Sequence, residues 1–371
     1  MTGLYPSSHN TVTASVPFPE TMTGHPVTAP ISTDVLPSGV PTLAEVLHQA
    51  GYRTLGFTAN PFLIEAFGFA RGFDTFRFYP GGDFARADRL VADAVAAVQT
   101  RDREKPVFLW VHFMEPHSPY VPGPLTAGMF KLTGLPEPIA AEMPIPSWLL
   151  PGTPRDRRLY VNAYDDESAA ADAAFDTLIR EFRFARPLRN TVVVLASDHG
   201  EQFLDHGGWE HGSNLYDELI RVPLIMQVPG VEPGVIDEQV ELIDVMPTLL
   251  DLAHTDTPPV AGHSLMTLFK RAKSERPVLS EIVGSQYAVR DGGFKYVLSD
   301  AGEGQLFDLT TDPHERRNIA AEQPHRVQAF RAVLERLIAD ANQRVGNIRR
   351  ERRPVDPLIV ERLRSLGYAH P

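Results

Sequence analysis

The sequence predicts an α/β protein built on a doubly wound mixed sheet, followed by a small C-terminal α+β domain. Helix-like and buried-strand patterns alternate up to about residue 270, which is typical of a sheet covered by helices on both faces. Four short strand patterns separated by turn residues follow, and they indicate a small antiparallel sheet. The apolar run Thr191–Ala196 leads into Asp198 and His199, and open α/β sheets place their sites at the carboxyl ends of such strands.

Composition excludes several classes of function. The chain has 371 residues, enough for a large core and a second domain, and a formal net charge of −12, which argues against nucleic acid as a partner. It has no cysteine, so disulfides, thiolate nucleophiles and Cys-based zinc sites are excluded. No apolar run is long enough to span a membrane, and Met1–Pro6 does not resemble a signal peptide. The compartment is not determined, and the cytoplasm is the default expectation.

The first part of the chain alternates between helices and strands. Residues 7–41 are rich in Ser, Thr, Pro and Gly and are predicted to form a long irregular loop. Gly123–Arg155 is Pro-rich, and we expect it to form a lid or a substrate-side insertion. Helical spacing of apolar residues predicts helices over Thr42–Ala50, Ala85–Thr100 and Arg158–Phe182. Buried strands are predicted over Arg53–Ala59, Pro106–Phe113, Thr191–Ser197 and Val222–Val228.

The last part of the chain has a different pattern. A short helix is predicted over Leu242–Leu252, with Asp244 placed to cap it. Four short strands then alternate with hairpin turns such as Asp291-Gly292-Gly293, and a helix over Pro324–Ala341 closes this part. The four strands are predicted over Val278–Ile282, Gln286–Arg290, Phe294–Leu298 and Gln305–Leu309. We therefore expect a first domain over residues 1–272 and a second over 273–371.

Asp198 and His199 are the first candidate metal ligands. A carboxylate next to an imidazole is a donor pair for a divalent cation. The simpler interpretation is that Asp198 caps the following turn and His199 is a surface residue. We favour the metal because a buried strand precedes the pair, Gly200 follows it, and further histidines come soon after.

Other histidines are candidates for contact with an anionic substrate. His117 lies in the rigid loop Glu115-Pro116-His117-Ser118-Pro119 beyond the strand Pro106–Phe113, so we expect it at the same sheet edge as Asp198. His211 is a candidate for binding an anionic oxygen or protonating a leaving group. His206 is interpreted as a loop residue and His112 as a core histidine. Single basic residues such as Lys295 are mostly solvated, and none is assigned a role.

Several strings, in the order and spacing found here, resemble the sulfatase family of the alkaline phosphatase superfamily. Thr2-Gly3-Leu4-Tyr5-Pro6-Ser7-Ser8-His9 is similar to the family's Thr-Gly-x-x-Pro-x-x-His-Gly stretch, with Asn10 where Gly is usual. Glu115–Tyr120 is similar to its Asp-Pro-His-x-Pro-Tyr loop. The other matching strings are Pro41–Leu47 with Gly51–Thr54, Ser197–Glu201, His211–Glu218 with Arg221–Leu224, Asp244–Leu250 and Leu363–Tyr368.

The resemblance implies a fold and a set of roles. The fold would be alkaline-phosphatase-like, with residues 1–272 as the catalytic domain. Asp198 and His199 would be metal ligands, with calcium as the first expectation and manganese, zinc or magnesium as alternatives. His117 and His211 would contact the sulfate or phosphate oxygens and serve the leaving group.

The resemblance also implies features that these strings do not contain. In the family an Asp-Asp pair on the first strand completes the metal site, and a nucleophile precedes the Thr-Gly-x-x-Pro stretch. The nucleophile is a Cys matured to formylglycine, or Ser or Thr in relatives. Because this sequence starts inside that stretch and has no cysteine, we expect it to lack the first strand, half the metal ligands and the nucleophile. A rival placement of the stretch at Met22–Pro26 would leave Thr13, Ser15 or Thr21 as nucleophile, but it fits less well.

These implications predict metal-dependent hydrolysis of sulfate esters, carried by small molecules or glycans. Two alternatives stay open. The first is a phosphodiesterase or phosphonate hydrolase on the same scaffold, with Thr or Ser as nucleophile. The second is a non-catalytic remnant of a sulfatase that binds an anion or a metal without turnover.

Overall fold

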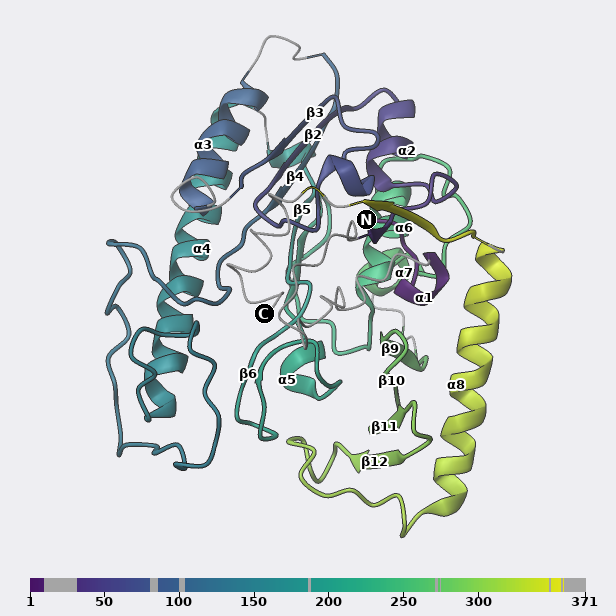
Figure 1. The fold of residues 1–371 in the computed structure, drawn as a ribbon. Coiled ribbons are helices and arrows are strands. Elements are labelled where there is room, and N and C mark those ends of the chain that lie inside the picture. Colours follow the sequence, from purple (N-terminus) through teal and green to yellow (C-terminus); the bar gives the residue numbers. More distant parts are fainter. Residues whose placement is uncertain are drawn as a thin grey trace.

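The computed structural model of the chain describes residues 1–9, 32–80, 86–99, 104–185, 188–270, 273, 275–346, 348–354 and 356. Its central layer is a three-stranded parallel sheet (Figure 1). The strands lie in the order β3 (Thr75–Phe78), β2 (Arg53–Thr58) and β4 (Val107–His112). Thr58 pairs with both Phe78 and His112, so the carboxyl ends of the three strands lie at one edge.

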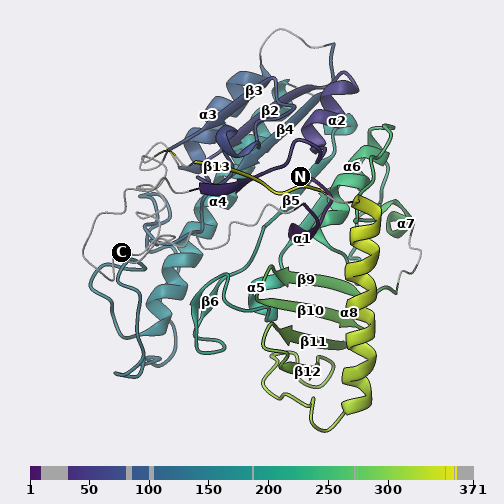
Figure 2. The same ribbon diagram turned by 45° about the vertical axis from the view of Figure 1, so that its right-hand side comes forward.

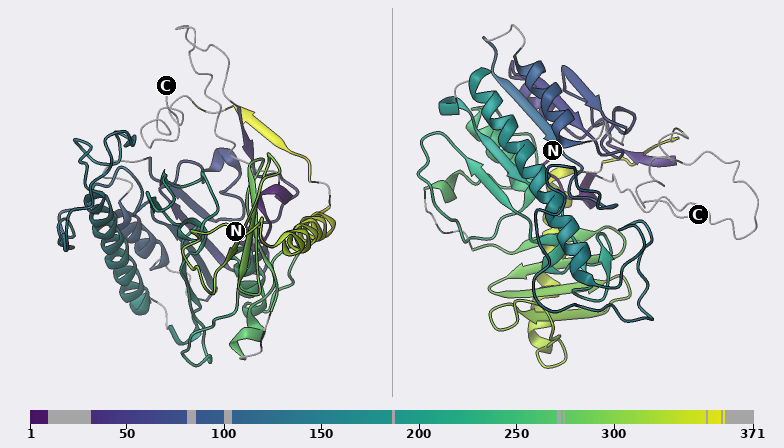
Figure 3. Two further views of the ribbon diagram at one scale, coloured as in Figure 1. Left: turned by 90° about the horizontal axis from the view of Figure 1, so that it is seen from below. Right: turned by 90° about the vertical axis from the view of Figure 1, so that its left-hand side faces the viewer.

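Helices cover both faces of this sheet. Helices α3 (Ala87–Val98) and α4 (Arg157–Ala185) run side by side on one face (Figure 3), where alternate β4 residues such as Leu109 pack. Helices α2 (Leu43–Gln49) and α6 (Val245–Leu252) lie on the other face with Phe108. The alternation of β4 side chains between the two cores follows from the period of two in a strand. The helices and strands predicted for this part are therefore present, with ends shifted by a few residues.

A second, two-stranded sheet continues toward the candidate site. Strand β5 (Val193–Ala196) pairs antiparallel with β8 (Leu224–Gln227). Among the described strands, β4 pairs only with β2, and β5 pairs only with β8. His112 Nε2 lies 3.7 Å from Asp198 Oδ2, which places the carboxyl ends of β4 and β5 next to each other.

The C-terminal part is an antiparallel sheet with a long helix on one face (Figure 2). The sheet order is β12 (Gly304–Asp308), β11 (Phe294–Ser299), β10 (Gln286–Asp291) and β9 (Val278–Ile282), and the helix is α8 (Pro324–Val345). The predicted turn at Gly292 and Gly293 has positive φ at both residues, a conformation that favours glycine.

The two faces of this sheet pack against different parts of the chain. Residues including Leu279, Val289, Tyr296 and Leu306 face α8. Ala288, Val297 and Phe307 pack against Leu215, just before the short helix α5 (Asp217–Ile220). The C-terminal sheet is thus in direct contact with the segment that follows His211.

Two segments differ from the sequence prediction. Strand β1 (Ser32–Val35) lies in the range predicted to be a loop, and it pairs antiparallel with β13 (Glu351–Pro354). Buried Asp34 of β1 accepts hydrogen bonds from Arg350 and Arg352. Residues 7–9 of the predicted loop belong to the short helix α1 (Pro6–His9), residues 36–41 are turns and irregular structure, and residues 10–31 lie outside the described residues.

Asp244 does not cap α6 with its side chain, contrary to prediction. Its carboxylate accepts hydrogen bonds from the backbone N–H groups of His263 (2.7 Å) and Glu241 (2.8 Å) and pairs with Arg276. The bond from Glu241 is part of the capping box of η4 (Leu242–Asp244), the short helix just before α6, and the other bonds join this helix start to two further segments. The remaining short elements are α1 (Pro6–His9), η1 (Glu65–Phe67), η3 (Leu188–Asn190), β6 (Gln202–Phe203), β7 (Trp209–Glu210), η4 (Leu242–Asp244) and α7 (Met266–Phe269).

None of the helices within the described ranges has the length and apolar character needed to cross a bilayer.

Candidate active site

The candidate site forms where β4 and β5 end. Strand β4 ends at His112, and Ser197, Asp198 and His199 follow β5. Asp198 Oδ2 lies 3.7 Å from His112 Nε2 and 3.8 Å from His199 Nε2. The Asp198 side chain is 57% exposed, so solvent and solutes can reach its carboxylate.

The electrostatics of this pair favour a charged carboxylate. Protein atoms packed near the Asp198 carboxylate oppose its ionisation, but the neighbouring imidazoles of His112 and His199 outweigh this effect. They hold the Asp198 pKa well below its usual range. His199 Nδ1 lies 2.9 Å from the carbonyl oxygen of Gly200, and because a carbonyl only accepts, Nδ1 carries the proton. In the tautomer that this contact favours, the lone pair is on Nε2, the nitrogen nearer Asp198, as a metal ligand requires.

These donors fit one side of a metal site. A carboxylate oxygen and an imidazole Nε2 are suitable ligands for a divalent cation, and His112 adds a second imidazole close by. His112 Nδ1 is buried without a hydrogen-bond partner. Within the described ranges, no three or more His, Asp or Glu side chains form a group that could enclose a metal ion. The described residues thus supply donors of the right kind but not a closed coordination shell.

His199, His211 and His117 form a group of neighbouring rings. The His211 ring stacks on His199 at 3.9 Å between centroids, and His117 meets His211 edge to face at 5.3 Å. His117 Nδ1 lies 2.6 Å from the Ser118 carbonyl oxygen, so this nitrogen also carries the proton. Residues from two loops that are far apart in sequence therefore meet beside Asp198.

Glu201 connects the two histidine loops. Its Oε1 lies 3.1 Å from His211 Nδ1, and its Oε2 accepts the Tyr120 hydroxyl at 3.0 Å. The Glu201 side chain is 4% exposed, so the carboxylate is almost completely removed from water. Each carboxylate oxygen holds one of the two loops.

The two histidines are driven toward different protonation states. Burial lowers the pKa of His117 to about 4, and the neighbouring charge of His211 contributes. Burial also opposes protonation of His211, but the hydrogen bond and charge of Glu201 outweigh it and raise the His211 pKa. The pKa values of the two neighbouring histidines are thus shifted in opposite directions, a pairing suited to binding an anion and donating a proton to it.

The loop that carries His117 is held by two glutamates. Ser118 Oγ donates to Glu210 at 2.8 Å, and Trp148 Nε1 of the Pro-rich segment donates to the same oxygen at 2.8 Å. The backbone N–H of Val121 donates to Glu167 on α4 at 2.6 Å. These bonds fix the part of the loop that follows His117.

The turn at Asp198 and His199 rests on α5. The Gly200 N–H donates to the Leu219 carbonyl at 2.8 Å. A Cβ atom at residue 200 would lie 2.0 Å from the Glu218 carbonyl oxygen, so only glycine fits there. The glycine after the metal-ligand pair is thus explained by close backbone contact.

The structure places the predicted residues as follows. Asp198, His199, His117 and His211 lie together, whereas His206 lies apart: its Nδ1 is 2.5 Å from Glu218 Oε1 and its ring stacks on Tyr216 at 3.6 Å. His112, interpreted as a core histidine, lies beside Asp198.

Sequence reasoning also missed Glu201, Tyr120 and Glu210. The sequence did contain an indication for Glu201, because this residue follows His199 by two positions in the Asp-His-Gly-Glu string. The nucleophile candidates Thr13, Ser15 and Thr21, and the string Leu363–Tyr368, lie outside the described residues.

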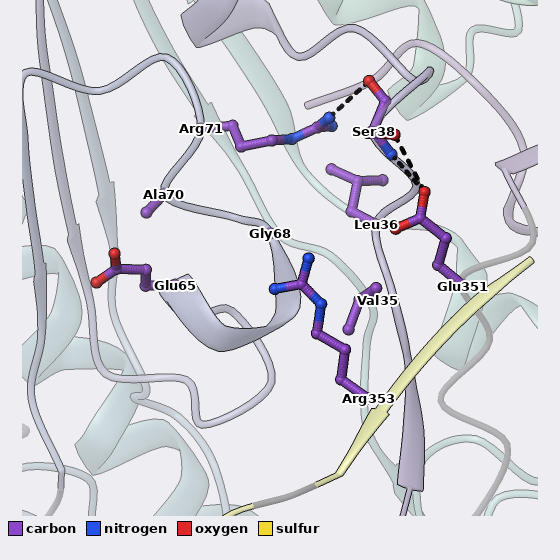
Figure 4. Close-up of a pocket in the computed structure, with 9 residues that line it drawn as sticks. All are labelled: Val35, Leu36, Ser38, Glu65, Gly68, Ala70, Arg71, Glu351 and Arg353. Carbon is purple, nitrogen blue, oxygen red and sulfur yellow. Dashed lines mark hydrogen bonds between the residues drawn. The ribbon is translucent and has the colours of Figure 1, made fainter.

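Two cavities lie elsewhere. One, of about 340 Å³, is lined by residues of β1, η1, β13 and the segments beside them (Figure 4). There Arg71 donates to the Ser38 carbonyl at 3.0 Å, and Glu351 accepts from the Ser38 N–H and hydroxyl, each at 3.1 Å. The other, of about 320 Å³, lies beside His263 and Arg276. No predicted site residue lines either cavity.

Family models match most of the chain. The model described as Sulfatase matches residues 1–255, and the model described as N-sulphoglucosamine sulphohydrolase, C-terminal, matches residues 205–343. Among curated relatives, arylsulfatase K of Mus musculus is 36% identical over 175 residues, 42% of this chain and 32% of that protein. An arylsulfatase of Clostridium perfringens (strain 13 / Type A) is 30% identical over 278 residues, 66% of this chain and 56% of that protein. The chain thus spans about a third to a half of the length of these relatives.

Solved structures share the fold. The phosphonate monoester hydrolase of Agrobacterium radiobacter has a TM-score of 0.73 at 18% identity, over 92% of this chain and 84% of that one. BT4656, in complex with its substrate D-glucosamine-2-N,6-O-disulfate, has a TM-score of 0.69 at 18% identity, over 93% of this chain and 86% of that one. The predicted α/β fold class with a C-terminal domain is confirmed.

Proposed function

Because the chain belongs to the sulfatase family, we propose that it hydrolyses sulfate esters at the site formed by Asp198, His199, His117 and His211. The observation that carries the proposal is the meeting of these four residues at one edge, with the pKa values of His117 and His211 shifted in opposite directions. Anion binding and proton donation are what sulfate ester cleavage requires of a site.

Each residue has a role in this proposal. Asp198 Oδ2 and His199 Nε2 would hold a divalent cation, and we propose calcium. A cation bound there would polarise the ester oxygens and favour the reactive form of a nucleophile. His117 would contact a sulfate oxygen. In the net reaction an oxygen atom from water bonds to sulfur, the ester S–O bond breaks, and the water proton passes to solvent. His211, held by Glu201 through Nδ1, would present the Nε2 side of its ring and donate a proton to the departing alcohol oxygen. The products are an alcohol and sulfate.

We propose a sulfated glycan as the substrate class. Two findings support it: the match of residues 205–343 to the C-terminal model of an N-sulphoglucosamine sulphohydrolase, and the fold shared with a protein that binds a sulfated glucosamine. The phosphonate monoester hydrolase of the same fold keeps a phosphonate ester as the second candidate substrate.

The test is hydrolysis of three substrates by the full chain with added CaCl₂, MnCl₂ or EDTA. The substrates are a glucosamine carrying O- and N-sulfate, p-nitrophenyl sulfate, and p-nitrophenyl phenylphosphonate. We expect sulfate release that EDTA abolishes and that His211→Gln lowers by about 10²-fold or more. Turnover of the phosphonate alone would establish the second candidate. Metal binding without turnover of any substrate would identify a non-catalytic member of the family.

A further inference from the structure

The interior of the molecule contains a charged cluster that joins the C-terminal sheet to α5. Lys295 of β11 is 0% exposed, and its Nζ lies 3.0 Å from Asp217 Oδ1 and 2.7 Å from Glu315 Oε1. Arg290 of β10 pairs with the other Asp217 oxygen at 2.8 Å. Two cations therefore balance two carboxylates. A buried ammonium is tolerated only when such partners replace its water, and removing one partner leaves an uncompensated charge.

Glu315 strengthens the connection to α5. While one carboxylate oxygen faces Lys295, the other accepts the backbone N–H of Asp217, the first residue of α5, at 2.7 Å. Glu315 has φ +53°, a left-handed conformation that non-glycine residues avoid. Its carbonyl oxygen also lies 3.3 Å from His206 Nε2. Strained backbone of this kind persists where surrounding contacts determine it, and here those contacts reach the loops on either side of His211.

Helix α5 in turn supports the metal-ligand turn. The Gly200 N–H bond to Leu219 and the close approach of Gly200 to the Glu218 carbonyl leave no space between α5 and residues 198–200. A shift of α5 must therefore move the turn or break that contact. Apolar packing of Ala288, Val297 and Phe307 against Leu215 surrounds the charged cluster and keeps α5 against the sheet.

We infer that Lys295 is a positioning residue of the active site: through Asp217 and Glu315 it fixes α5, and α5 fixes the turn that carries Asp198 and His199. The inference rests on the proposed function only for the role of that turn. The mechanical path from Lys295 to Gly200 can be tested without catalysis.

The test is hydrogen–deuterium exchange, followed by mass spectrometry, on the full chain carrying Lys295→Met. Methionine keeps the length of the side chain and removes the charge. Leu334→Ala is the control, because Leu334 belongs to the core between α8 and the sheet, a cluster that includes no residue of α5. The two variants are compared under conditions that give an equal loss of global stability.

We expect amides in segments 197–204 and 215–220 to exchange about tenfold faster in Lys295→Met, as local opening there becomes easier. In Leu334→Ala the increase should be confined to the C-terminal sheet and α8. Unchanged exchange at 197–204 in Lys295→Met, with faster exchange only in β10–β12, would overturn the inference. If Lys295→Met does not fold, Glu315→Gln takes its place, because its amide oxygen can still accept the Asp217 N–H while the charge opposite Lys295 is lost.

A second readout is Mn²⁺ affinity, measured by titration with the metal alone. We expect Lys295→Met to weaken Mn²⁺ binding several-fold and Leu334→Ala to leave it unchanged. If the wild-type chain binds no Mn²⁺ and turns over no ester, the proposed function fails, and the exchange experiment still decides the role of Lys295.

Discussion

The carboxylate of Glu201 lies 3.1 Å from Nδ1 of His211 and is almost fully buried. Its second oxygen accepts the Tyr120 hydroxyl, so a single side chain holds the two loops that carry His211 and His117. The buried charge also favours the cationic form of His211. Substitutions can separate the two roles of Glu201, which are to hold the loops together and to favour the cationic form of His211.

Replacing Glu201 with Gln keeps an acceptor of the same shape and removes the negative charge. We expect kcat for sulfate ester hydrolysis to fall about 10- to 100-fold, with a smaller change in KM, because His211 loses the partner that supports its imidazolium. Steady-state kinetics measure this. Tyr120→Phe, which removes only the hydroxyl, serves as the control and should have a small effect. An equal loss in both variants would show that Glu201 acts by holding the loop.

Gly200→Ala should destabilise the fold by about 1–3 kcal/mol, because the new methyl group would overlap the Glu218 carbonyl oxygen. Urea unfolding measures the change. The control is Gly234→Ala, since a Cβ at residue 234 meets no atom within 4 Å. Equal stability of the two variants would contradict the close packing of α5 on the turn.

Added calcium should raise the melting temperature of the chain if Asp198 and His199 hold the ion. At a concentration about 100-fold above Kd, a ligand adds about 2.7 kcal/mol to folding stability. Thermal melts with CaCl₂ and with EDTA measure the shift, and Asp198→Asn should remove it. A shift that survives in Asp198→Asn would place the ion elsewhere.

Glu167 makes stability depend on pH. Burial, with Glu115 nearby, raises the pKa of Glu167 to about 8, against about 4.3 in an unfolded chain. Between these values the unfolded chain loses the proton and the folded chain keeps it, so stability falls as pH rises from about 4.3 to 8 and levels off above that.

Glu167→Gln, which is neutral at every pH, should remove this slope. Between pH 5 and 8, the free energy of unfolding of the variant should rise relative to that of the wild type. The rise should be up to about 1.4 kcal/mol per pH unit. Urea unfolding at pH 5, 6.5 and 8 measures it. Glu137→Gln, at a surface pair with Arg157, should give a constant difference across this range. Parallel curves for Glu167→Gln and wild type would refute the raised pKa.

Local patterns were enough to predict the elements that are built locally. The helical spacing of α2, the amphipathic spacing of α3, and the hairpin glycines at residues 292 and 293 each act within a few residues. The candidate site followed from such patterns as well, because strand ends, prolines and short strings place Asp198 and His117 without long-range information.

Long-range partners could not be predicted in this way. Ser32 pairs with Pro354, and nothing in either neighbourhood indicates the other. Lys295, expected to be solvated, is completely buried because Asp217 and Glu315 compensate its charge from separate segments. His112 was read as a core residue because its strand is apolar, whereas its position at the strand end decides its contact with Asp198.

The buried Lys295 cluster limits how parts of this chain can be exchanged between relatives. A recombination crossover at residue 272 would take Asp217 from one parent and Lys295, Arg290 and Glu315 from the other. Any mismatch would leave a charge in the interior without its partner. A crossover near residue 204 would inherit all four residues together with His206, and the family model of the C-terminal part begins at residue 205. Where two parents differ at these four residues, chimeras joined near residue 204 should keep the charged cluster that chimeras joined at residue 272 divide.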